Sequence, residues 1–584
     1  MKTFATRSRW LFFALLAFVL TACVAEPSKL WLDAPGWSRG HQIGATTALD
    51  PVLPARGEDG ALYFLLVADE GLEHHLQFIA LDGLGQVAGQ WDIHLEAEAA
   101  VDEPKLYWSS EGLSAYWIQD NGLYSLKLSE DGQAIGKVEK LSGDLLVNHI
   151  TTAQAPDGRV EVWFSLAARE GGIYRVDPQG EPQQVAAQGV NPQLQFDQQG
   201  GLHAAWVYNE PGDTQYHFFY AYSAEGEYQP GSQREVYATR FSLTSNFVGP
   251  DIGFDGEKVY FFWSELVRTG LSAGSTRARF TVLPAGSEQA RQEETLYFPY
   301  SYHLNYTQPT DWQQRGETAP IGEQSSGQTS NLTDFFTDPE SQGSALILAL
   351  RGRLPYLRNK ESSQVALAFF GGEGVESYQL LSFSRTFSKM PAVWSDEQGY
   401  LYATWLEAAD EGESLYFAST APAYVTAFSE LGTEDYSSMA IDTLLGMFSG
   451  LVLIFLPLIW IVAPMIILLL TSPLRRENQS LRAPGVLISL ALTLGAYWWS
   501  KLAFFPWITE YVPFSAWLPI IPPSWEIPML IAVPVLIALL GLWAAWNFTF
   551  AKDRRSTLFF ILIYAGVDGL LTAAIYGVVF YGAI

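Results

Sequence analysis

The segment Pro192–Trp206, PQLQFDQQGGLHAAW, contains two short apolar strands joined by a turn with glycine, and its second strand ends in tryptophan. The same pattern returns in Pro250–Trp263, PDIGFDGEKVYFFW, and in Pro391–Trp405, PAVWSDEQGYLYATW. Alternating apolar and polar residues on both sides of a glycine turn are typical of β-hairpins. The repetition indicates that much of the chain is built from one β-sheet unit used several times.

The spacing of the units predicts the fold. Weaker copies surround three further glycines, so that the turn glycines Gly60, Gly112, Gly158, Gly200 and Gly256 follow one another at spacings of 52, 46, 42 and 56 residues. Spacings of about 40–50 residues are typical of the four-stranded blades of β-propellers. We therefore expect residues 45–425 to form an all-β propeller of six to eight blades, with Gly399 in an equivalent turn. A pair of β-sandwiches or a β-solenoid is the alternative.

The pattern Pro-x-Leu-x-x-Asp-x-x-Gly-x-Leu-x-x-x-Trp resembles the repeats of sialidase-like and related bacterial surface propellers. The resemblance covers much of residues 50–420 and implies a propeller fold. The Ser-x-Asp-x-Gly-x-Thr-Trp motif of sialidases is not intact in any copy. Sialidase activity is therefore a less secure expectation than the fold.

The amino terminus has the features of an export signal. Three basic residues precede the apolar run Trp10–Leu20, which is shorter than a comfortable transmembrane span. The run leads into Leu20–Cys23, LTAC, which resembles the lipobox of bacterial lipoproteins and contains the only cysteine of the chain. We expect residues 1–22 to be a signal peptide, Cys23 to carry lipid and residues 23–44 to be a linker. An uncleaved signal anchor is the alternative.

The last quarter of the chain is much more apolar. Four stretches reach the roughly 20 residues that a helix needs to cross a membrane: Leu444–Leu470, Val486–Phe505, Ile527–Phe550 and Thr557–Phe580. We expect residues 444–584 to form a domain of four transmembrane helices, joined to the propeller by a linker at 426–443. The charged fraction of only 16% agrees with a chain that lies partly in lipid.

Basic residues in the short loops predict the orientation of these helices. The loops 471–485 and 551–556 each contain three Lys or Arg residues, whereas the segment Trp507–Glu526 contains none. By the positive-inside rule both basic loops are cytoplasmic. The sequence therefore predicts a multi-pass protein of a bacterial cytoplasmic membrane, with the propeller and the carboxyl terminus on the extracytoplasmic side.

Charge and cysteine content exclude several functions. The part expected outside the membrane carries 24 basic and 56 acidic residues, a net charge of -32. Nucleic-acid binding needs clustered Lys and Arg, so we expect no nucleic-acid partner. One cysteine excludes a disulfide framework and cysteine-rich metal sites. An acidic body favours solubility beside an anionic membrane, and leaves Ca²⁺ or a cationic partner as the alternative; no other cofactor is expected.

Residues 285–343 interrupt the repeat. They are rich in Gln, Ser, Thr and Gly, and the aromatic cluster Tyr297–Tyr302 lies near their beginning. A loop of this length in a compact domain is commonly functional or disordered. We expect an insertion in the propeller with only its aromatic part ordered.

The first candidate site is the mouth of the propeller. Acidic or amide residues follow the tryptophan strands at comparable positions: Asp120, Asn209, Glu210, Glu265 and Glu407. If these strands line the central channel, the side chains converge where propellers usually bind ligands. Converging carboxylates suit Ca²⁺, or the acid and base of glycoside hydrolysis. Ordinary strand-end solvation explains the same pattern without a ligand.

The second candidate site lies in the membrane. Tyr564, Asp568, Thr572 and Tyr576 form a polar-capable stripe on the last span, beside a stripe of small residues. A charge in mid-span costs about 3 kcal/mol unless it is paired, protonated or hydrated. Lys501 is the basic residue within reach of Asp568. A structural lock between helices and a proton or ion relay are both compatible with this pattern.

Together these features predict a membrane-anchored propeller that binds, senses or scaffolds at the outer face of the cytoplasmic membrane. The expected partners are membrane lipid, another membrane or envelope protein, and a carbohydrate or peptide ligand. The alternatives are a sialidase-like glycoside hydrolase, which needs a cluster of arginines at the channel mouth, and a component of a membrane transport complex. Five arginines gather near the fifth repeat: Arg234, Arg240, Arg268, Arg277 and Arg279.

Overall fold

The computed structural model describes residue 34 and residues 36–581, except for 58–59, 71–72, 96–99, 110–111, 169–170, 211, 300–327, 342–345, 358–359, 372–373, 410–411, 452–454, 475–482, 510–524 and 551–555. The expected signal peptide and Cys23 lie outside these residues. So do the basic residues of the two loops expected to be cytoplasmic.

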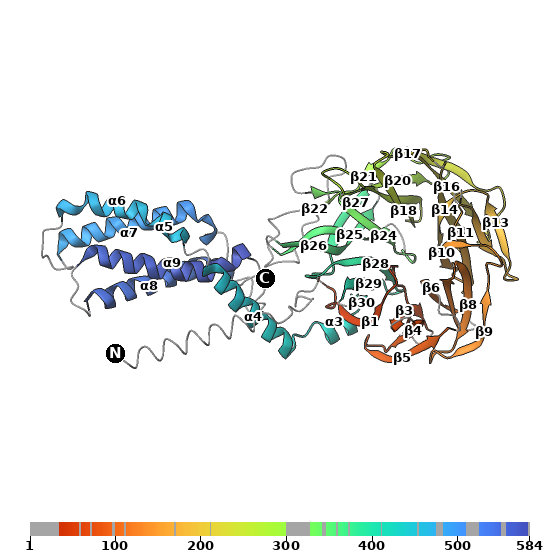
Figure 1. Cartoon of the computed structure of the whole chain (residues 1–584), viewed down its shortest axis with the longest axis horizontal. Coiled ribbons are helices and arrows are strands. Elements are labelled where there is room, and N and C mark those ends of the chain that lie inside the picture. The colour runs from red at the N-terminus through yellow and green to blue at the C-terminus, as the bar shows by residue number, and fades with distance from the viewer. Residues whose placement is uncertain are drawn as a thin grey trace.

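The described residues form seven four-stranded antiparallel sheets, which confirms the predicted propeller and fixes the number of blades. Figure 1 looks onto the ring, with the first strand of each blade nearest its centre. The first blade contains β2 (Ala55–Arg56), β3 (Leu62–Glu70), β4 (Glu73–Leu81) and β5 (Val87–His94). The second contains β6 (Val101–Ser109), β7 (Gly112–Gln119), β8 (Gly122–Leu128) and β9 (Ala134–Lys140). The third contains β10 (Val147–Gln154), β11 (Val160–Leu166), β12 (Ile173–Val176) and β13 (Pro182–Ala186).

The remaining blades repeat this order. The fourth contains β14 (Val190–Phe196), β15 (Leu202–Asn209), β16 (Gln215–Ser223) and β17 (Arg234–Arg240). The fifth contains β18 (Ser245–Phe254), β19 (Lys258–Val267), β20 (Thr276–Pro284) and β21 (Glu294–Thr295). A two-stranded sheet of β22 (Phe298–Pro299) and β23 (Gln328–Thr329) follows, and the sixth blade then contains β24 (Leu332–Thr337), β25 (Leu346–Leu357), β26 (Lys360–Gly371) and β27 (Gly374–Leu380).

The seventh blade closes the ring with strands from both ends of the propeller. It contains β28 (Ser388–Ser395), β29 (Leu401–Ala408) and β30 (Glu413–Ser419), and β1 (His41–Thr46) pairs with β30 as its outer strand. β1 therefore lies mostly within the segment 23–44 that was expected to be a linker. β24, the inner strand of the sixth blade, lies within the expected insertion at 285–343.

The repeat seen in the sequence is a hairpin of the first two strands of a blade. The six turn glycines, Gly60, Gly112, Gly158, Gly200, Gly256 and Gly399, all precede or begin a second strand, and all have φ between 80° and 102°. In three of these turns an aspartate accepts hydrogen bonds from amides two to four residues later. This left-handed region favours glycine, which explains the Asp-x-x-Gly pattern.

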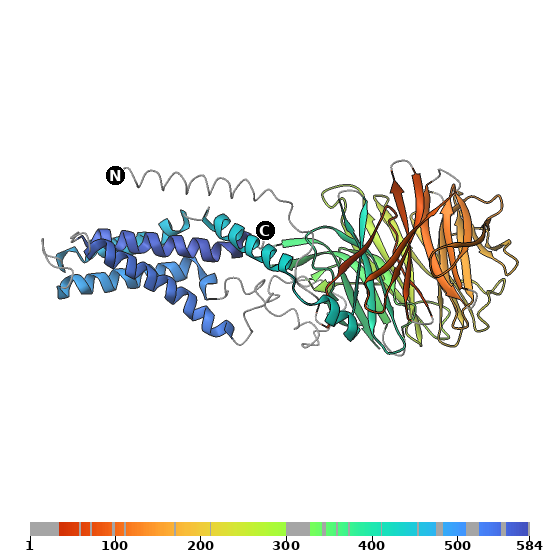
Figure 2. The same cartoon turned by 90° about the horizontal axis from the view of Figure 1, so that it is seen from below.

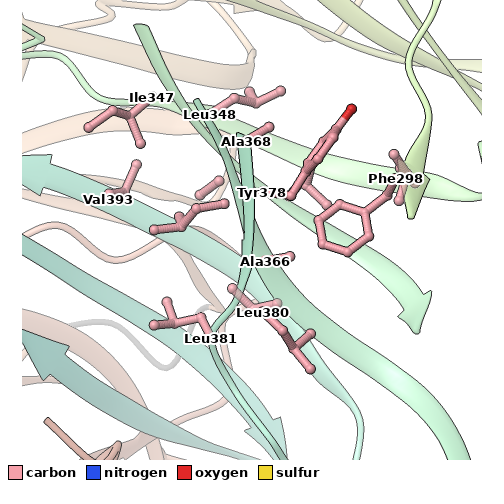
Figure 3. Packing of buried hydrophobic residues seen from close by; sticks show 14 of the residues in the cluster. Phe298, Ile347, Leu348, Ala366, Ala368, Tyr378, Leu380, Leu381 and Val393 are labelled. Carbon is pink, nitrogen blue, oxygen red and sulfur yellow. The ribbon is translucent and has the colours of Figure 1, made fainter. Parts of the chain in front are cut away.

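The core consists of apolar layers between adjacent blades. The repeat tryptophans of the second strands are fully buried: Trp117, Trp163, Trp206, Trp263 and Trp405. Figure 3 shows one such layer, in which Ile347, Leu348 and Ala366 of the sixth blade pack near Val393 of the seventh. Blades pack face to face, so the hydrophobic interior of the ring is a series of separate apolar clusters.

The carboxyl-terminal part is helical (Figures 1 and 2). After α3 (Pro422–Phe428) and α4 (Thr433–Gly450) come α5 (Leu456–Trp460), α6 (Val462–Leu470), α7 (Pro484–Phe504), α8 (Glu526–Phe550) and α9 (Thr557–Tyr581), with short 3₁₀ helices η2 (Ser472–Leu474) and η3 (Pro506–Ile508). Three helices in the described part of the chain, α7, α8 and α9, are long and apolar enough to cross a membrane.

The first expected span is not a single helix. Leu444–Leu470 is divided among the end of α4, α5 and α6. Pro457 and Pro464 lie in the first turns of α5 and α6, where a missing backbone N–H needs no partner within the helix. Three of the four predicted spans therefore coincide with long helices of the described residues, and the crossing of a membrane by the first stretch stays a prediction.

Candidate functional site

A cavity of about 560 Å³ lies at the centre of the propeller. Its wall is formed by residues of the inner strands β6, β10, β14, β18, β24 and β28, and by the segment 49–56 that includes β2. Each of the seven blades therefore contributes its inner strand to the wall of the cavity. Its lining mixes apolar and aromatic side chains with a few charged and amide groups, as in most small-ligand sites.

Five inner strands carry an irregular residue at the same level. Glu103, Asn191, Gly249, Asp334 and Met390 all have positive φ, and the register of the pairing shifts at each of them. In four of the five strands the next residue is a proline. Proline cannot donate a hydrogen bond within a sheet, so it is tolerated where a bulge interrupts the pairing. The proline that begins each sequence repeat thus marks the bulge of an inner strand.

Three of the bulges connect their blade to the next one. Glu103 accepts hydrogen bonds from the Ile150 amide at 2.7 Å and contacts His149 Nδ1 at 2.6 Å. Asn191 donates to the Gly249 carbonyl at 2.7 Å, and Asp334 accepts from the Met390 amide at 3.3 Å. The side chains at the bulges are therefore used mainly to hold neighbouring inner strands together.

Four carboxylates belong to the wall of the cavity, and three of them have a basic neighbour. Asp334 pairs with Arg351 at 2.9 Å, and Glu340 pairs with Arg56 at 3.1 Å. Burial raises the pKa of Asp50, while the charges of Lys105 and His149 oppose this shift. Asp251, on β18, forms no ion pair with any residue that the structure describes.

Asp251 is the most unusual of these groups. Burial raises its pKa to about 7, although hydrogen bonds from Thr337 and Ile252 act in the opposite direction. Its Oδ2 atom is buried and has no hydrogen-bond partner within the described part of the chain. Gln195 Oε1 is also buried without a described partner, while Gln195 Nε2 donates weakly to the Asp338 carbonyl at 3.4 Å. Two acceptors in the cavity wall are therefore unsatisfied.

The residues predicted for the propeller mouth do not line this cavity. Asp120, Asn209, Glu210, Glu265 and Glu407 all lie in, or directly after, second strands of their blades, one strand away from the channel. Second strands end on one face of the ring because all blades have the same topology. The five residues therefore share a face but do not converge on the channel.

Three of these residues have local structural contacts. Asp120 and Asn121 both have positive φ in a two-residue hairpin turn. Asn209 donates to the carbonyls of Asp213 and Gln215, at 3.0 and 2.7 Å. Glu407 is completely buried and accepts hydrogen bonds from Ser384 at 2.9 Å and from Trp405 at 2.8 Å.

Sequence reasoning missed the groups that do line the cavity, including Asp251 and Gln195. Both lie on the first strand of a repeat hairpin, between the proline that begins the repeat and the glycine turn. The proline was the available signal, because it identifies the bulged inner strand. Within the described residues, no group of three or more His, Cys, Asp or Glu side chains is arranged to hold a metal ion. Ca²⁺, the alternative that the acidic composition leaves open, stays a prediction.

The intramembrane candidates lie together in the helical bundle. Lys501 Nζ is 2.7 Å from Asp568 Oδ2, and both side chains are completely buried. Lys501 also donates to Thr572 at 2.8 Å, and Tyr497 donates to Asp568 at 2.7 Å. Tyr564 accepts a hydrogen bond from Trp498 at 2.9 Å. Tyr576 lies on the same buried stripe of α9, against Phe505.

The bundle also contains unsatisfied groups. Asp568 Oδ1 and the Tyr576 hydroxyl are buried without a hydrogen-bond partner among the described residues. The Lys501 ammonium lies 4.8 Å from the ring centre of Trp498, which adds a cation–π contact. The cluster joins α7 to α9 through charge and hydrogen bonds.

Comparisons with known proteins do not identify a family for this chain. No family model matches the chain, and no curated protein matches it. Similar solved structures include Penicillium chrysogenum α-L-arabinanase, with 11% identity and a TM-score of 0.29, covering 46% of this chain and 80% of that one. Polysaccharide lyase Uly1 has 10% identity and a TM-score of 0.38, covering 64% and 89%. Trypanosoma rangeli sialidase in complex with DANA has 10% identity and a TM-score of 0.33, covering 68% and 61%. At these values the likeness carries no argument about activity.

Proposed function

We propose that this chain is a membrane-anchored β-propeller that binds a ligand in its central cavity, as a binding or sensing module at the outer face of the cytoplasmic membrane. The observation that carries this proposal is the cavity of about 560 Å³ with unsatisfied acceptors in its wall. Buried polar groups without partners are costly, so a bound molecule that satisfies them gains affinity.

The size and lining of the cavity suit a small molecule or one segment of a peptide. Apolar and aromatic residues provide contact area, including Phe196, Phe336 and Trp394. The polar groups are few and specifically placed, which is how small-ligand sites fix orientation. Membrane attachment is supported by the three apolar helices, and the outer location by the lipobox-like signal and the loop charges.

A cavity-filling substitution tests the binding role. Ala153 lies on β10 and lines the cavity, so Ala153→Trp should fill part of it. Ala134→Trp is the matched control, because Ala134 is exposed on the outer strand β9. The purified full chain is screened by thermal shift against amines, saccharides and short peptides. Ligands that stabilise the wild type and Ala134→Trp should fail to stabilise Ala153→Trp. The proposal is wrong if every ligand acts equally on all three proteins, or if none binds the wild type.

The glycoside hydrolase alternative has less support. Arg56 is the one arginine in the described cavity wall, and it is paired with Glu340. The five arginines near the fifth blade, from Arg234 to Arg279, do not line the cavity. Assay of the same preparation with fluorogenic glycosides would reveal hydrolysis, and a rate removed by Ala153→Trp would favour the enzyme over the binding module.

The transport alternative rests on one observation, the buried Lys501–Asp568 pair with its unpartnered carboxylate oxygen. An ionisable pair inside a membrane bundle is a frequent feature of proton and ion pathways. Proton flux into proteoliposomes tests this role, with Asp568→Asn as the comparison. Flux equal to that of empty vesicles would exclude autonomous proton transport by this bundle.

A further inference from the structure

We propose that the cavity is specific for an organic cation, whose ammonium or guanidinium group pairs with Asp251. This inference rests on the proposed binding function and names the chemical class of its ligand. It depends on the charge balance of the cavity wall, on two unsatisfied acceptors and on the residues around them.

The charge balance singles out Asp251. The other carboxylates in the wall have basic partners or neighbours: Arg351 for Asp334, Arg56 for Glu340, and Lys105 with His149 for Asp50. Asp251 has none among the described residues. An ionised carboxylate in a cavity is strongly stabilised by an opposite charge that also donates hydrogen bonds. The missing partner of Asp251 is therefore a cation supplied by the ligand.

A second acceptor lies in the same corner of the cavity. Gln195 on β14 donates to the carbonyl of Asp338, and Asp251 on β18 interacts with the preceding residue, Thr337. Both side chains therefore approach the same end of β24. Gln195 is only 5% exposed, and its Oε1 has no partner within the described residues. One ligand with several N–H donors can satisfy Asp251 Oδ2 and Gln195 Oε1 together.

Ammonium and guanidinium groups fit this requirement, because they have three and five donors and no acceptor. Aromatic residues elsewhere in the wall, such as Phe335, Phe336 and Trp394, suit the apolar body of an organic cation and permit cation–π contacts. The described residues provide no cluster of metal ligands, which favours an organic cation over a bare metal ion. The net charge of -32 on the expected exported region attracts cations towards the propeller.

Few titratable groups surround Asp251. Its neighbour β14 contains no charged residue, and β24 contains only Asp334, which is paired with Arg351 of β25. The paired strand β19 contains Lys258, Tyr260 and Glu265, but Phe262 is the residue opposite Asp251. The other strands in contact with β18 add His203 and Tyr208 on β15 and Arg353 on β25. Asp338, directly after β24, is hydrogen-bonded to Ser395, and burial raises its pKa to about 6. A cation beside Asp251 stabilises the ionised form and lowers its pKa. Binding near neutral pH should therefore release a proton from Asp251 to solvent.

Isothermal titration calorimetry on the purified full chain tests the proposal. The probes are phenethylamine and its neutral isostere 2-phenylethanol. We expect the amine to bind more tightly than the alcohol, and Asp251→Asn to weaken amine binding about tenfold or more, as expected for loss of a charged hydrogen bond. Asp144→Asn is the matched control: it removes a carboxylate in an exposed turn outside the cavity wall, and should change affinity less than about threefold.

Proton release provides a readout that does not depend on affinity alone. Titrations at about pH 6.5 in two buffers of different ionisation enthalpy should reveal protons released by wild type and not by Asp251→Asn. Gln195→Leu, a second variant, should weaken the amine while leaving proton release intact. A single cooperative thermal transition of each variant without ligand shows that it is folded.

The outcomes separate this inference from the proposed function. Equal amine affinity in wild type and Asp251→Asn overturns the cation site. Equal binding of amine and alcohol, both lost in Ala153→Trp, also overturns it but leaves the binding cavity in place. Phenethylamine could also fail to bind while a saccharide from the screen binds to wild type and not to Ala153→Trp. That result likewise overturns the cation site and leaves the binding cavity in place. Absence of any ligand in the screen removes both proposals.

Discussion

Lys501 and Asp568 are completely buried in the helical bundle, so each charge depends on the other for its stability. Asp568→Asn removes the negative partner and leaves the Lys501 ammonium uncompensated. Loss of one member of a buried pair commonly costs about 3–5 kcal/mol, whereas replacement of both can be nearly neutral. We therefore expect Asp568→Asn to lower the thermal stability of the bundle in detergent more than the double variant Asp568→Asn, Lys501→Met.

Asn547→Leu is the control for this experiment, because Asn547 is an exposed polar residue on α8. It should change the denaturation temperature little. Additive losses in the two single variants and the double variant would show that the ion pair does not stabilise the bundle. If the double variant is more stable than the sum of the two single losses predicts, the result supports a structural lock between the helices rather than a proton or ion relay.

Asp251 should make the stability of the propeller depend on pH. Burial raises its pKa from 3.8 to about 7, so between these values the folded protein holds a proton that the unfolded chain has lost. Stability therefore falls as pH rises through this window and becomes constant above it. Asp251→Asn cannot lose this proton. We expect the difference in denaturation temperature, variant minus wild type, to increase from about pH 4 to about pH 7 and then level off.

Asp144→Asn, in an exposed turn, serves as the comparison and should show a flat difference over the same range. Denaturation is followed in the full chain without ligand. A flat difference for Asp251→Asn as well would mean that its carboxyl group titrates normally, and would remove the predicted release of a proton on cation binding.

At the scale of elements, the bulges of the inner strands should be sensitive to substitution. Gly249 has φ of 121°, and an added Cβ atom would lie 3.1 Å from the Phe262 carbonyl oxygen. Backbone strain of this kind costs about 1–3 kcal/mol per residue. We expect Gly249→Ala to destabilise the propeller by this amount in chemical denaturation. Gly83→Ala, where nothing lies within 4 Å of the new atom, should be nearly neutral and provides the control. Equal stability of both variants would show that the bulge tolerates a side chain.

The blades could be predicted from the sequence because their signals are local. A glycine turn followed by a second strand with a buried tryptophan, as in Asp197–Trp206, is found in five of the seven blades, and each copy is recognisable without the rest of the chain. Ring closure could not be predicted in this way. β1 pairs with β30 across more than 360 residues, and its six residues have no feature that identifies their partner.

The candidate sites show the same division between local and long-range information. The pairing of Lys501 with Asp568 could be anticipated because the rise per residue of a helix fixes the relative height of the two residues along their helices. The residues of the cavity wall could not be predicted, because the sequence does not show which strand of a blade is innermost. The tryptophan strands were expected to line the channel, but they are the second strands of their blades. The structure shows that the innermost strand is the one with the bulge and its proline, as in β6, β14, β18 and β28.

At the scale of the whole molecule, the chain enters and leaves the ring at the seventh blade. β1 and β30 are adjacent there, and the helices α3 and α4 follow directly, between propeller and bundle in Figure 2. Arg39, just before β1, pairs with Asp435 of α4 at 2.9 Å. The ring of His41 stacks on Phe428 of α3 at a centroid distance of 3.6 Å. These contacts attach the closing strand of the propeller to the segment that leads into the apolar helices.

The single cysteine makes the predicted topology testable. Cys23→Ser should prevent lipid attachment and yield a cysteine-free protein that α7, α8 and α9 still hold in the membrane. Single cysteines are then introduced as Ser272→Cys on the propeller, Ser515→Cys between α7 and α8, and Ser480→Cys between α6 and α7. A membrane-impermeant maleimide is added to spheroplasts. Positive loops stay in the cytoplasm, so the first two cysteines should react at once and the third only after lysis.

Ser272 is the internal control of this experiment, since it is exposed on the loop between β19 and β20. Its labelling before lysis establishes the side of the propeller, and the other two sites establish the direction in which α7 crosses. Labelling at Ser480→Cys before lysis, together with protection at Ser272→Cys, would reverse the whole topology. The propeller cavity would then face the cytoplasm, and its cationic ligand would be sought among intracellular amines. Labelling at both Ser272→Cys and Ser480→Cys would instead mean that no helix crosses between them, and that the broken segment α4–α6 stays on the propeller side of the membrane.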